Sequence, residues 1–388
     1  VIRAIASYAG REVALRRDGK AATGRALIDT LRYTIAPPGR LPLRPILFSL
    51  VEVPDLRAIP EEWPGLRDIW IGAGPVPEVL HRGLGALALL VRFGLLRSLS
   101  PFATLFYWAI NRLRWGEHRG GMFVAIAGHD ADGNRVARSW HLLAEGDDGP
   151  LIPSMAAEAV IRKVLAGQSP QPGARAATGA LELADYDALF ARRRIRHGIR
   201  QDADDAGPLP LYRRMLGTAW DELPPALRAM HDLRASCTAC GRASVTRGSH
   251  PLARVIAALF RFPKASDDVP VEVTFDVSGG RETWRRDFAG RAFQSIQSQG
   301  KGAFERLVAE RFGPFVFGLA LVIEDGRLNL VLRGWRCLGI PLPLSWAPGG
   351  AAHETARDGK FRFHVEIGHP LCGRIVRYEG WLDPPQPI

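Results

Sequence analysis

Lysine and cysteine are scarce in this sequence, and arginine takes the place of lysine. Of the 388 residues, 51 are lysine or arginine and only five are lysine, so the net charge of +11 comes almost entirely from arginine. The four cysteines, Cys237, Cys240, Cys337 and Cys372, are too few for a disulfide scaffold in a chain of this length. We therefore expect reduced thiols and a cytoplasmic protein.

A secretion signal is missing as well, because Arg3, Arg11, Arg16 and Arg17 interrupt the apolar residues near the N-terminus. The chain begins with Val1, which predicts a processed chain or part of a longer product. Acidic residues are interspersed with the arginines, whereas a nucleic-acid surface gathers basic residues on one face with aromatic stacking partners. We therefore expect no nucleic-acid partner.

The sequence also lacks a glycine-rich nucleotide-binding turn. A dinucleotide site needs Gly-x-Gly-x-x-Gly between a strand and a helix, because glycines let the backbone approach the pyrophosphate. Gly72-Ala-Gly74 has no third glycine, and Gly83-Leu-Gly85 follows no predicted strand. We also find no Ser/His/Asp spacing, no His-Glu-x-x-His and no P-loop. The sequence therefore predicts no bound cofactor and no metal, and it identifies no catalytic residue.

The residue pattern predicts an α+β protein of two domains. The length suits two domains, and the polar stretch 197–209 is typical of a linker. We predict residues 1–200 as a domain with a mixed or antiparallel sheet and covering helices. Residues 210–388 are predicted to form a curved, antiparallel β-rich domain packed on one or two helices.

Apolar alternation and turn residues predict the individual elements. In the first domain we predict hairpins over 11–24 and 122–143, strands over 46–53 and 68–71, and a helix over 150–166. The turn of the first hairpin is placed at Asp18-Gly19, since this dipeptide favours tight turns. In the second domain we predict helices over 211–233 and 251–260, together with about eight strands.

Residues 79–116 combine arginine with apolar and aromatic residues and contain no acid. Pro101 is expected to separate two helices, neither of which has the roughly 18–20 apolar residues that cross a bilayer. One interpretation is peripheral contact of residues 83–113 with the inner face of the membrane, where arginines snorkel and aromatic rings lie at headgroup depth. The alternative is a helical pair that covers the sheet or forms a homodimer through the first domain. The candidate membrane residues are Arg92, Arg97, Tyr107, Trp108 and Trp115.

His250-Pro251-Leu252 and His369-Pro370-Leu371 form a repeated tripeptide. A structural role at a turn or helix start is one interpretation. The other is a pocket in which basic side chains meet an acidic head group. The candidate pocket residues are Arg247, His250, Arg286, Trp335 and His369.

Cys237-Thr-Ala-Cys240 has the spacing of half a zinc site. A structural zinc ion needs two further ligands, and the nearest histidines, His231 and His250, match no standard spacing. We therefore interpret the pair as ordinary thiols.

Several spaced elements in the first half carry a family resemblance. They are Val53-Pro-Asp-Leu56, Trp63-Pro-Gly65, the hairpin from Gly121 to Glu145, Pro150-Leu-Ile-Pro-Ser-Met-Ala-Ala157 and Leu165-Ala-Gly167. With these elements, residues 45–183 resemble the later part of saccharopine dehydrogenase-like oxidoreductases. The resemblance implies a sheet-containing second domain, and it begins downstream of where the family's NAD(P)-binding Rossmann domain would stand.

The second half carries another resemblance. Its elements are Leu211-Tyr-Arg-Arg-Met-Leu216, Arg247-Gly-Ser-His-Pro-Leu252, Glu310-Arg-Phe-Gly313, Gly339-Ile-Pro-Leu-Pro343, Lys360-Phe-Arg-Phe363 and Tyr378-Glu-Gly-Trp-Leu382. Residues 210–383 resemble a bacterial domain of unknown function that follows saccharopine dehydrogenase-like modules. The resemblance implies a fold and a fusion partner, and no chemistry.

Together these observations give two expectations for function. The first is an incomplete saccharopine dehydrogenase-like protein that is not active alone and whose full-length parent is an NAD(P)-dependent oxidoreductase. The second is a hydrophobic-ligand or lipid-binding protein that uses the C-terminal curved sheet, because such a sheet can enclose an apolar pocket.

Overall fold

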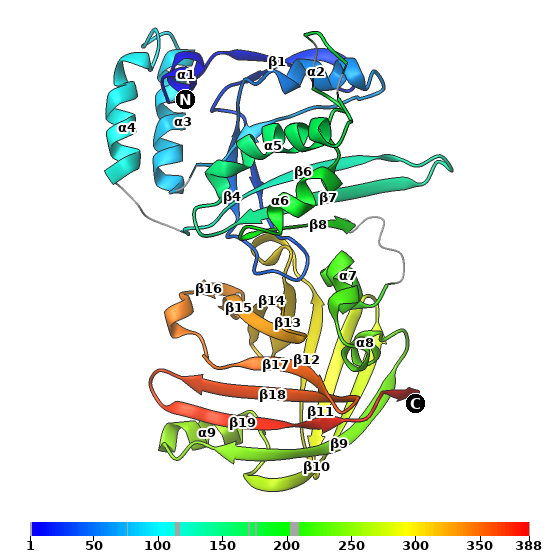
Figure 1. Ribbon diagram of the computed structural model, residues 1–388. Helices are drawn as coiled ribbons and strands as arrows, with labels where there is room; N and C mark the ends of the chain where they lie inside the picture. Colours follow the sequence, from blue (N-terminus) through cyan, green and yellow to red (C-terminus); the bar gives the residue numbers. More distant parts are fainter. Residues whose placement is uncertain are drawn as a thin grey trace. The chain divides into compact units, whose positions relative to one another are not determined.

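The computed structural model describes residues 2–75, 77–112, 117–169, 171–174, 177–201 and 209–387. Backbone contacts divide the chain into two compact units, traced in Figure 1. Unit 1 comprises Val1–Ile35, Leu43–Gly121 and Leu143–Arg196, and unit 2 comprises Ala36–Pro42, Met122–Leu142 and His197–Ile388. Most of the predicted linker, residues 202–208, lies outside the described residues.

The first half of the chain alternates short strands with helices. Its elements are α1 (Ile2–Tyr8), β1 (Glu12–Arg17), β2 (Lys20–Arg25), β3 (Thr30–Tyr33), β4 (Ile46–Leu50), α2 (Asp55–Glu62), β5 (Gly72–Ala73), α3 (Glu78–Arg92), η1 (Ser100–Phe102), α4 (Ala103–Arg112), β6 (Gly120–His129), β7 (Arg135–Ala144), η2 (Gly149–Leu151), α5 (Ile152–Leu165), α6 (Leu183–Phe190) and β8 (Ile195–Gln201). The described strands pair as β1-β2, β3-β4-β5 and β6-β7-β8.

Local sequence signals place most of these elements correctly. The β1–β2 turn has positive φ angles at Asp18 and Gly19, as the predicted hairpin requires. The predicted hairpin 122–143 is confirmed as β6 and β7, and the predicted helix 150–166 is confirmed as η2 and α5.

The strand predicted over 68–71 is wrong. Ile69, Trp70 and Ile71 pack against the apolar cluster of β1, β4 and α2. These residues lie in a loop, where they are partly buried. Only the two-residue β5 that follows them pairs with β4. A loop that buries apolar side chains has the same sequence pattern as a strand, although it lacks the hydrogen bonds between strands. The pattern alone therefore predicted a strand at these residues.

Helices α1, α3 and α4 pack together through small side chains. Their buried contacts are made by Ala6, Ala9, Ala88 and Ala103, joined by Leu99. Pro101 lies in η1 between α3 and α4, so the predicted division into two helices is confirmed. The Oγ of Ser49 on β4 lies 2.6 Å from Nε2 of the buried His81, which attaches α3 to the sheet.

Unit 2 is built mainly from long antiparallel strands. Its remaining elements are α7 (Leu211–Leu216), η3 (Gly217–Glu222), α8 (Pro225–His231), β9 (Cys237–Arg247), α9 (Pro251–Leu259), β10 (Ser266–Ser278), β11 (Arg281–Phe288), β12 (Arg291–Gln299), η4 (Gly302–Phe304), β13 (Val308–Phe312), β14 (Phe315–Glu324), β15 (Arg327–Cys337), β16 (Ile340–Leu342), η5 (Leu344–Trp346), β17 (Ala352–Arg357), β18 (Lys360–His369), β19 (Gly373–Leu382) and β20 (Gln386–Pro387).

Among the described strands, ten close into a ring, which we call the closed sheet. The order is β9-β10-β11-β12-β13-β14-β15-β17-β18-β19, and β19 pairs back with β9. All of these pairings are antiparallel. Short turns join most neighbouring strands, whereas α9 lies between β9 and β10, and β16 with η5 lies between β15 and β17. The predicted α+β class with a curved antiparallel second sheet is therefore confirmed, and the sheet is curved far enough to close.

Helices stand at both ends of the closed sheet (Figure 1). Helix α8 precedes β9 and α9 follows it, so the two helices lie toward opposite ends of that strand. The single helix predicted over 211–233 is wrong, because the chain divides there into α7, η3 and α8. Gly217 has a φ of 53°, and Pro224 and Pro225 start a new helix.

Candidate functional site

An open cleft of about 430 Å³ lies in unit 2 where the end of α9 meets the β11–β12 and β13–β14 hairpins. Its floor is aromatic and its edge carries cationic and polar side chains. The lining residues are Leu259, Phe260, Arg261, Arg285, Ala292, Phe293, Gln294, Phe312 and Gly313.

The end of α9 places Phe260 and Arg261 at the cleft. The amide of Phe262 donates to the carbonyl of Ala257, and the amide of Arg261 donates to Ala258. This pair of bonds is the Schellman arrangement, in which the residue after the C-cap adopts a left-handed conformation usually given to glycine. Here that residue is Arg261, with a φ of 56°. A non-glycine residue in this conformation costs about 1–2 kcal/mol, and Arg261 is one of nine such residues that have a positive φ in the described part of the chain.

Aromatic rings form the floor of the cleft. The ring of Phe312 lies 5.3 Å from Phe260 and is stacked at 5.7 Å on Phe262. Phe293 meets Phe262 edge to face at 5.4 Å. These contacts give the cleft an apolar, aromatic floor, which suits the binding of an apolar group.

The edge of the cleft is positively charged. Arg261 and Arg285 are both exposed, and Arg285 has a loose ion pair with Asp287 at 3.8 Å. Among the described residues, no carboxylate lies within salt-bridge distance of Arg261. A guanidinium group next to an apolar floor suits a ligand that combines an apolar part with an anionic group.

The outer face of α9 adds exposed apolar surface beside the cleft. Leu252, Val255 and Leu259 lie three and four residues apart and therefore share one side of the helix. Val255 and Leu259 are 64% and 73% exposed, which is unusual for large aliphatic residues on a helix that packs on a sheet.

The interior of the closed sheet carries a chain of polar contacts. Alternate residues of β11 and β12 point inward, and this places Arg286 next to Ser295 at 3.0 Å. Ser295 donates to Glu310 at 2.6 Å, and Gln297 also donates to that carboxylate. The guanidinium of Arg286 lies over the ring of Trp284 at 5.1 Å. A charged arginine is thereby kept inside the sheet by an opposite charge and aromatic faces.

A second polar group lies at the α7–α8 end of the interior. The Nε2 of His231 is 2.5 Å from Oε2 of Glu354, and the ring of His231 stacks on Tyr212. Tyr212 and His231 are fully buried, yet the Tyr212 hydroxyl and the His231 Nδ1 have no hydrogen-bond partner among the residues that the structure describes. Burial, followed by the charges of Glu354 and Glu282, raises the pKa of the Tyr212 phenol well above its usual value.

Glu282 belongs to the same end of the interior. Its carboxylate accepts hydrogen bonds from the indole of Trp284 at 3.1 Å and from the backbone amide of Leu211 at 3.3 Å. Burial raises the pKa of Glu282, and the hydrogen bond from Trp284 opposes that shift. The interior is therefore not a purely apolar core.

The repeated His-Pro-Leu tripeptides have the same local structure. In each, the Nδ1 of the histidine accepts a hydrogen bond of 3.2 Å from the leucine amide two residues later. His250 thereby caps α9, which begins at Pro251, and His369 closes the turn between β18 and β19. Each histidine uses one ring nitrogen to fix the backbone.

The other predicted pocket residues have separate partners. The guanidinium of Arg247 donates to the carbonyls of Phe262 and Pro263, and burial lowers its pKa. The indole of Trp335 donates to the Pro343 carbonyl at 2.9 Å. Arg286 points into the closed sheet, as described above. None of the five predicted pocket residues lines the cleft among the described residues.

The paired cysteines do not face one another. On β9, residues three apart point to opposite faces, so Cys237 is buried while Cys240 is exposed. No cluster of three or more His, Cys, Asp or Glu side chains suited to a metal ion occurs within the described ranges.

The predicted membrane residues lie on the helical pair of unit 1. Arg92 ends α3, Arg97 lies in the connection, and Tyr107 and Trp108 are exposed on α4, while Trp115 is outside the described residues. In the part of the chain that the structure describes, every helix is too short or too polar to cross a bilayer.

The sequence did not single out Arg261, Arg285 or Tyr212 as site residues, and it suggested His231 only as a zinc ligand. Arg261 could have been found as an arginine directly after a predicted helix that ends without glycine. Tyr212 and His231 lie on α7 and α8, which were predicted as one continuous helix. Their partners Glu354 and Glu282 are distant in sequence, and no spacing rule links them.

A comparison with curated proteins gives no match to this chain. Residues 223–382 match a family model described as a domain of unknown function, DUF4166. The match begins just before α8 and ends with β19, so it spans every strand of the closed sheet. The predicted domain of unknown function over residues 210–383 is thereby confirmed for residues 223–382, and the closed sheet with its α9 cleft lies in the region similar to that family.

Proposed function

We propose that unit 2 binds a small amphipathic anion in the cleft at the end of α9. The observation that carries this proposal is an aromatic floor bordered by Arg261 and Arg285. The volume of about 430 Å³ lies within the range of small-molecule sites, roughly 300–1,000 Å³. The apolar part of the ligand would lie on Phe260 and Phe312, and its anionic group would face the two guanidinium groups.

The end of α9 supports this assignment. Arg261 directly follows the C-cap residue Phe260, so the end of the helix brings an aromatic and a cationic side chain together at the cleft. The proposed ligand is of the predicted class, an apolar molecule with an acidic head group. The arginines proposed to contact that head group are now Arg261 and Arg285 instead of Arg247 and Arg286.

Two fluorescent probes with related ring systems test the proposal. 1-Anilinonaphthalene-8-sulfonate carries an anionic group, and N-phenyl-1-naphthylamine lacks it. Ala292→Trp fills the cleft and is expected to weaken both probes at least tenfold. Arg261→Gly combined with Arg285→Gln is expected to weaken the anionic probe selectively, and Arg261→Lys should retain most of its affinity.

Ser298→Trp is the matched control, because Ser298 lies on the same strand toward the opposite end from Ala292. Unchanged affinity of both probes for Ala292→Trp would show that they bind elsewhere and would overturn the proposal. Equal weakening of both probes by the arginine variants would remove the anionic part of it.

We also propose that the chain is the C-terminal portion of a cytoplasmic saccharopine dehydrogenase-like protein, whose full-length parent is an NAD(P)-dependent oxidoreductase. The paired strands in the first half of the chain support this origin, since the resemblance implies a sheet-containing second domain. Because no glycine-rich turn was found, the chain alone is expected not to bind NADPH. Titration of NADPH fluorescence tests this, and micromolar binding by the chain would contradict it.

A further inference from the structure

Unit 1 carries a large exposed apolar surface on its helical pair, which we call the α3–α4 surface. It includes residues at the end of α3, in the connection and on α4. They are Leu90, Phe93, Leu95, Phe102, Leu105, Tyr107 and Trp108. Phe93 and Leu95 are 69% and 71% exposed, so the most exposed of these side chains lie in the connection directly after α3. Exposed apolar patches of this kind mark interaction sites.

The buried contacts between α1, α3 and α4 are made mainly by other side chains. The helices pack through an alanine-rich side, and Leu84, Leu87 and Phe106 are partly buried against that cluster. The large residues of the α3–α4 surface therefore add apolar area outside the packed side of these helices.

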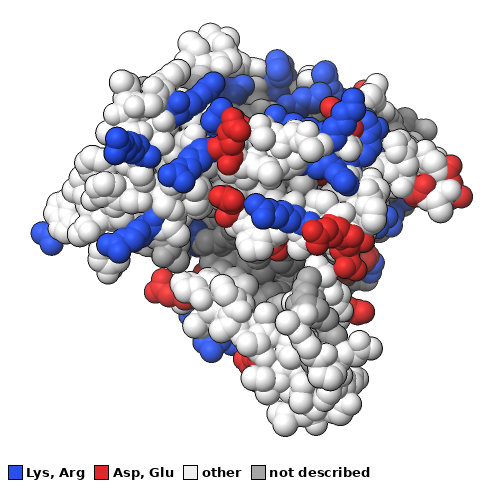
Figure 2. All heavy atoms as spheres, turned by 90° about the horizontal axis from the view of Figure 1, so that it is seen from above, with Lys and Arg blue, Asp and Glu red and all other residues white. Residues whose placement is uncertain are grey.

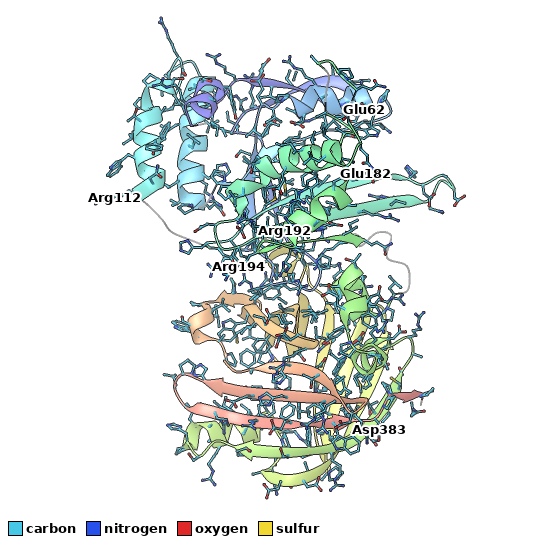
Figure 3. All side chains as sticks on the ribbon, in the orientation of Figure 1. Glu62, Arg112, Glu182, Arg192, Arg194 and Asp383 are labelled. Atoms are coloured by element: carbon cyan, nitrogen blue, oxygen red, sulfur yellow. The ribbon has the colours of Figure 1, made fainter. Side chains whose placement is uncertain are left out.

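The charge around the α3–α4 surface has one sign. Residues 79–112 contain no aspartate or glutamate. Arg92, Arg97 and Arg112 are exposed, and no carboxylate of the described residues lies within salt-bridge distance of them. Figure 3 shows Arg112 at the C-terminal end of α4. In Figure 2, the left margin, where α3 and α4 lie, is white and blue, which corresponds to uncharged and basic residues.

We propose that the α3–α4 surface docks on an anionic lipid membrane, with the helices lying in the interface. Leu95 and Phe93 would enter the acyl region, and the rings of Tyr107 and Trp108 would lie at headgroup depth. Arg92, Arg97 and Arg112 would contact acidic headgroups, because long arginine side chains reach the interface while their stems cover apolar surface.

A lipid surface fits this chemistry better than a second copy of the chain. In a two-fold dimer the same surface lies on both sides, so the unpaired arginines of one copy would face those of the other. Among the described residues 79–112 no acid can neutralise them. Anionic lipids supply that negative charge along the whole surface.

Flotation with vesicles tests the proposal with the full chain. Phosphatidylcholine vesicles with 30% phosphatidylglycerol are compared with pure phosphatidylcholine vesicles at about 0.1 M salt. The chain is expected to float with the anionic vesicles and to remain at the bottom with the neutral ones. Replacing Arg92, Arg97 and Arg112 together by glutamine should weaken partitioning on the order of 100-fold, since each basic residue near the surface contributes about fivefold.

The matched control replaces Arg57, Arg138 and Arg192 by glutamine, because these arginines are also exposed and lie outside the α3–α4 surface. It changes the net charge equally and is expected to retain most of the binding. Equal losses in the two triple variants would show that net charge alone acts and would overturn the proposal. The apolar contribution is tested by Leu95→Ser with Trp108→Ser, which should abolish flotation while circular dichroism stays unchanged.

Sedimentation velocity distinguishes the lipid surface from a second copy. The proposal expects the same sedimentation coefficient for the unmodified chain and for Leu95→Ser with Trp108→Ser. A dimer of the unmodified chain that the double variant dissociates, together with no flotation, would assign the surface to self-association and overturn the membrane proposal.

Discussion

The ring of His231 lies nearly parallel to the phenol ring of Tyr212, with centroids 3.9 Å apart and planes inclined by 18°. Both side chains are fully buried inside the closed sheet. Three polar atoms of this stacked pair differ in their hydrogen bonding. His231 Nε2 bonds to Glu354, whereas His231 Nδ1 and the Tyr212 hydroxyl have no hydrogen-bond partner in the described part of the chain. This difference predicts opposite effects for two substitutions in direct contact.

Tyr212→Phe is expected to leave the free energy of unfolding unchanged or to raise it by about 1 kcal/mol, because a buried hydroxyl without a partner costs desolvation energy. The ring and its stacking contacts remain. Urea denaturation followed by circular dichroism measures the effect. Tyr107→Phe, at an exposed position, is the control. Destabilisation of Tyr212→Phe by more than 1 kcal/mol would mean that the hydroxyl has a stabilising partner.

His231→Leu is expected to lower the free energy of unfolding by about 3–5 kcal/mol, because it leaves the buried carboxylate of Glu354 without its partner. Adding Glu354→Gln should recover part of this loss, since the unpaired charge is then removed. The double-mutant cycle measures the coupling. Additive effects of the two substitutions would contradict a direct interaction between these side chains.

Glu282→Gln is expected to change how stability depends on pH. Burial raises the pKa of Glu282 in the folded state, so folding is favoured while the group is protonated. That contribution is fully present below the unfolded pKa, near 4.5, and is lost as the pH rises through the folded value. Relative to the unmodified chain, Glu282→Gln should therefore become more stable as the pH rises from 4 to 7. Glu324→Gln, at an exposed position, should show no such trend in the same denaturation series.

For His141 we predict a contribution to stability with the opposite pH dependence. Burial, followed by the charges of Arg200 and Arg306, lowers the pKa of His141 to about 2. The folded protein keeps the ring neutral, while the unfolded chain takes up a proton near pH 6.5. Stability should therefore fall below pH 6.5 by about 1.4 kcal/mol per pH unit from this group. In His141→Gln the slope between pH 6.5 and 5 should be smaller by about one proton, and an unchanged slope would contradict a neutral buried ring. His129→Gln is the exposed control.

Local signals in the sequence predicted the elements well where neighbouring residues decide the structure. Asp18-Gly19 can adopt the two positive φ angles of a tight turn, and Pro251 suits the first turn of α9. The two wrong predictions also come from relying on the local sequence pattern. The apolar residues of 68–71 are partly buried although they lie in a loop. The apolar period of 211–233 continues across Gly217, whereas the helix ends there.

Closure of the sheet could not be predicted from local pattern. It depends on pairing of β9 with both β10 and β19, and the latter joins Arg247 to Val376 across more than a hundred residues. The cleft follows from the same long-range geometry, since it gathers the end of α9 and two hairpins. The sequence suggested basic side chains that meet an acidic head group, and this ligand class stays a prediction; which side chains are neighbours in space could not be predicted.

The left-handed backbone at Arg261 gives the last prediction. Arg261→Gly removes the steric cost of this conformation, and part of the gain is lost to the greater freedom of glycine in the unfolded chain. We expect the free energy of unfolding to rise by up to about 1 kcal/mol. Arg254→Gly also removes an exposed arginine from the same helix, but in its interior, where glycine costs about 1 kcal/mol. Urea denaturation should therefore move the two midpoints in opposite directions. If both variants lose stability equally, the left-handed backbone at Arg261 costs little, and its side chain stabilises the fold.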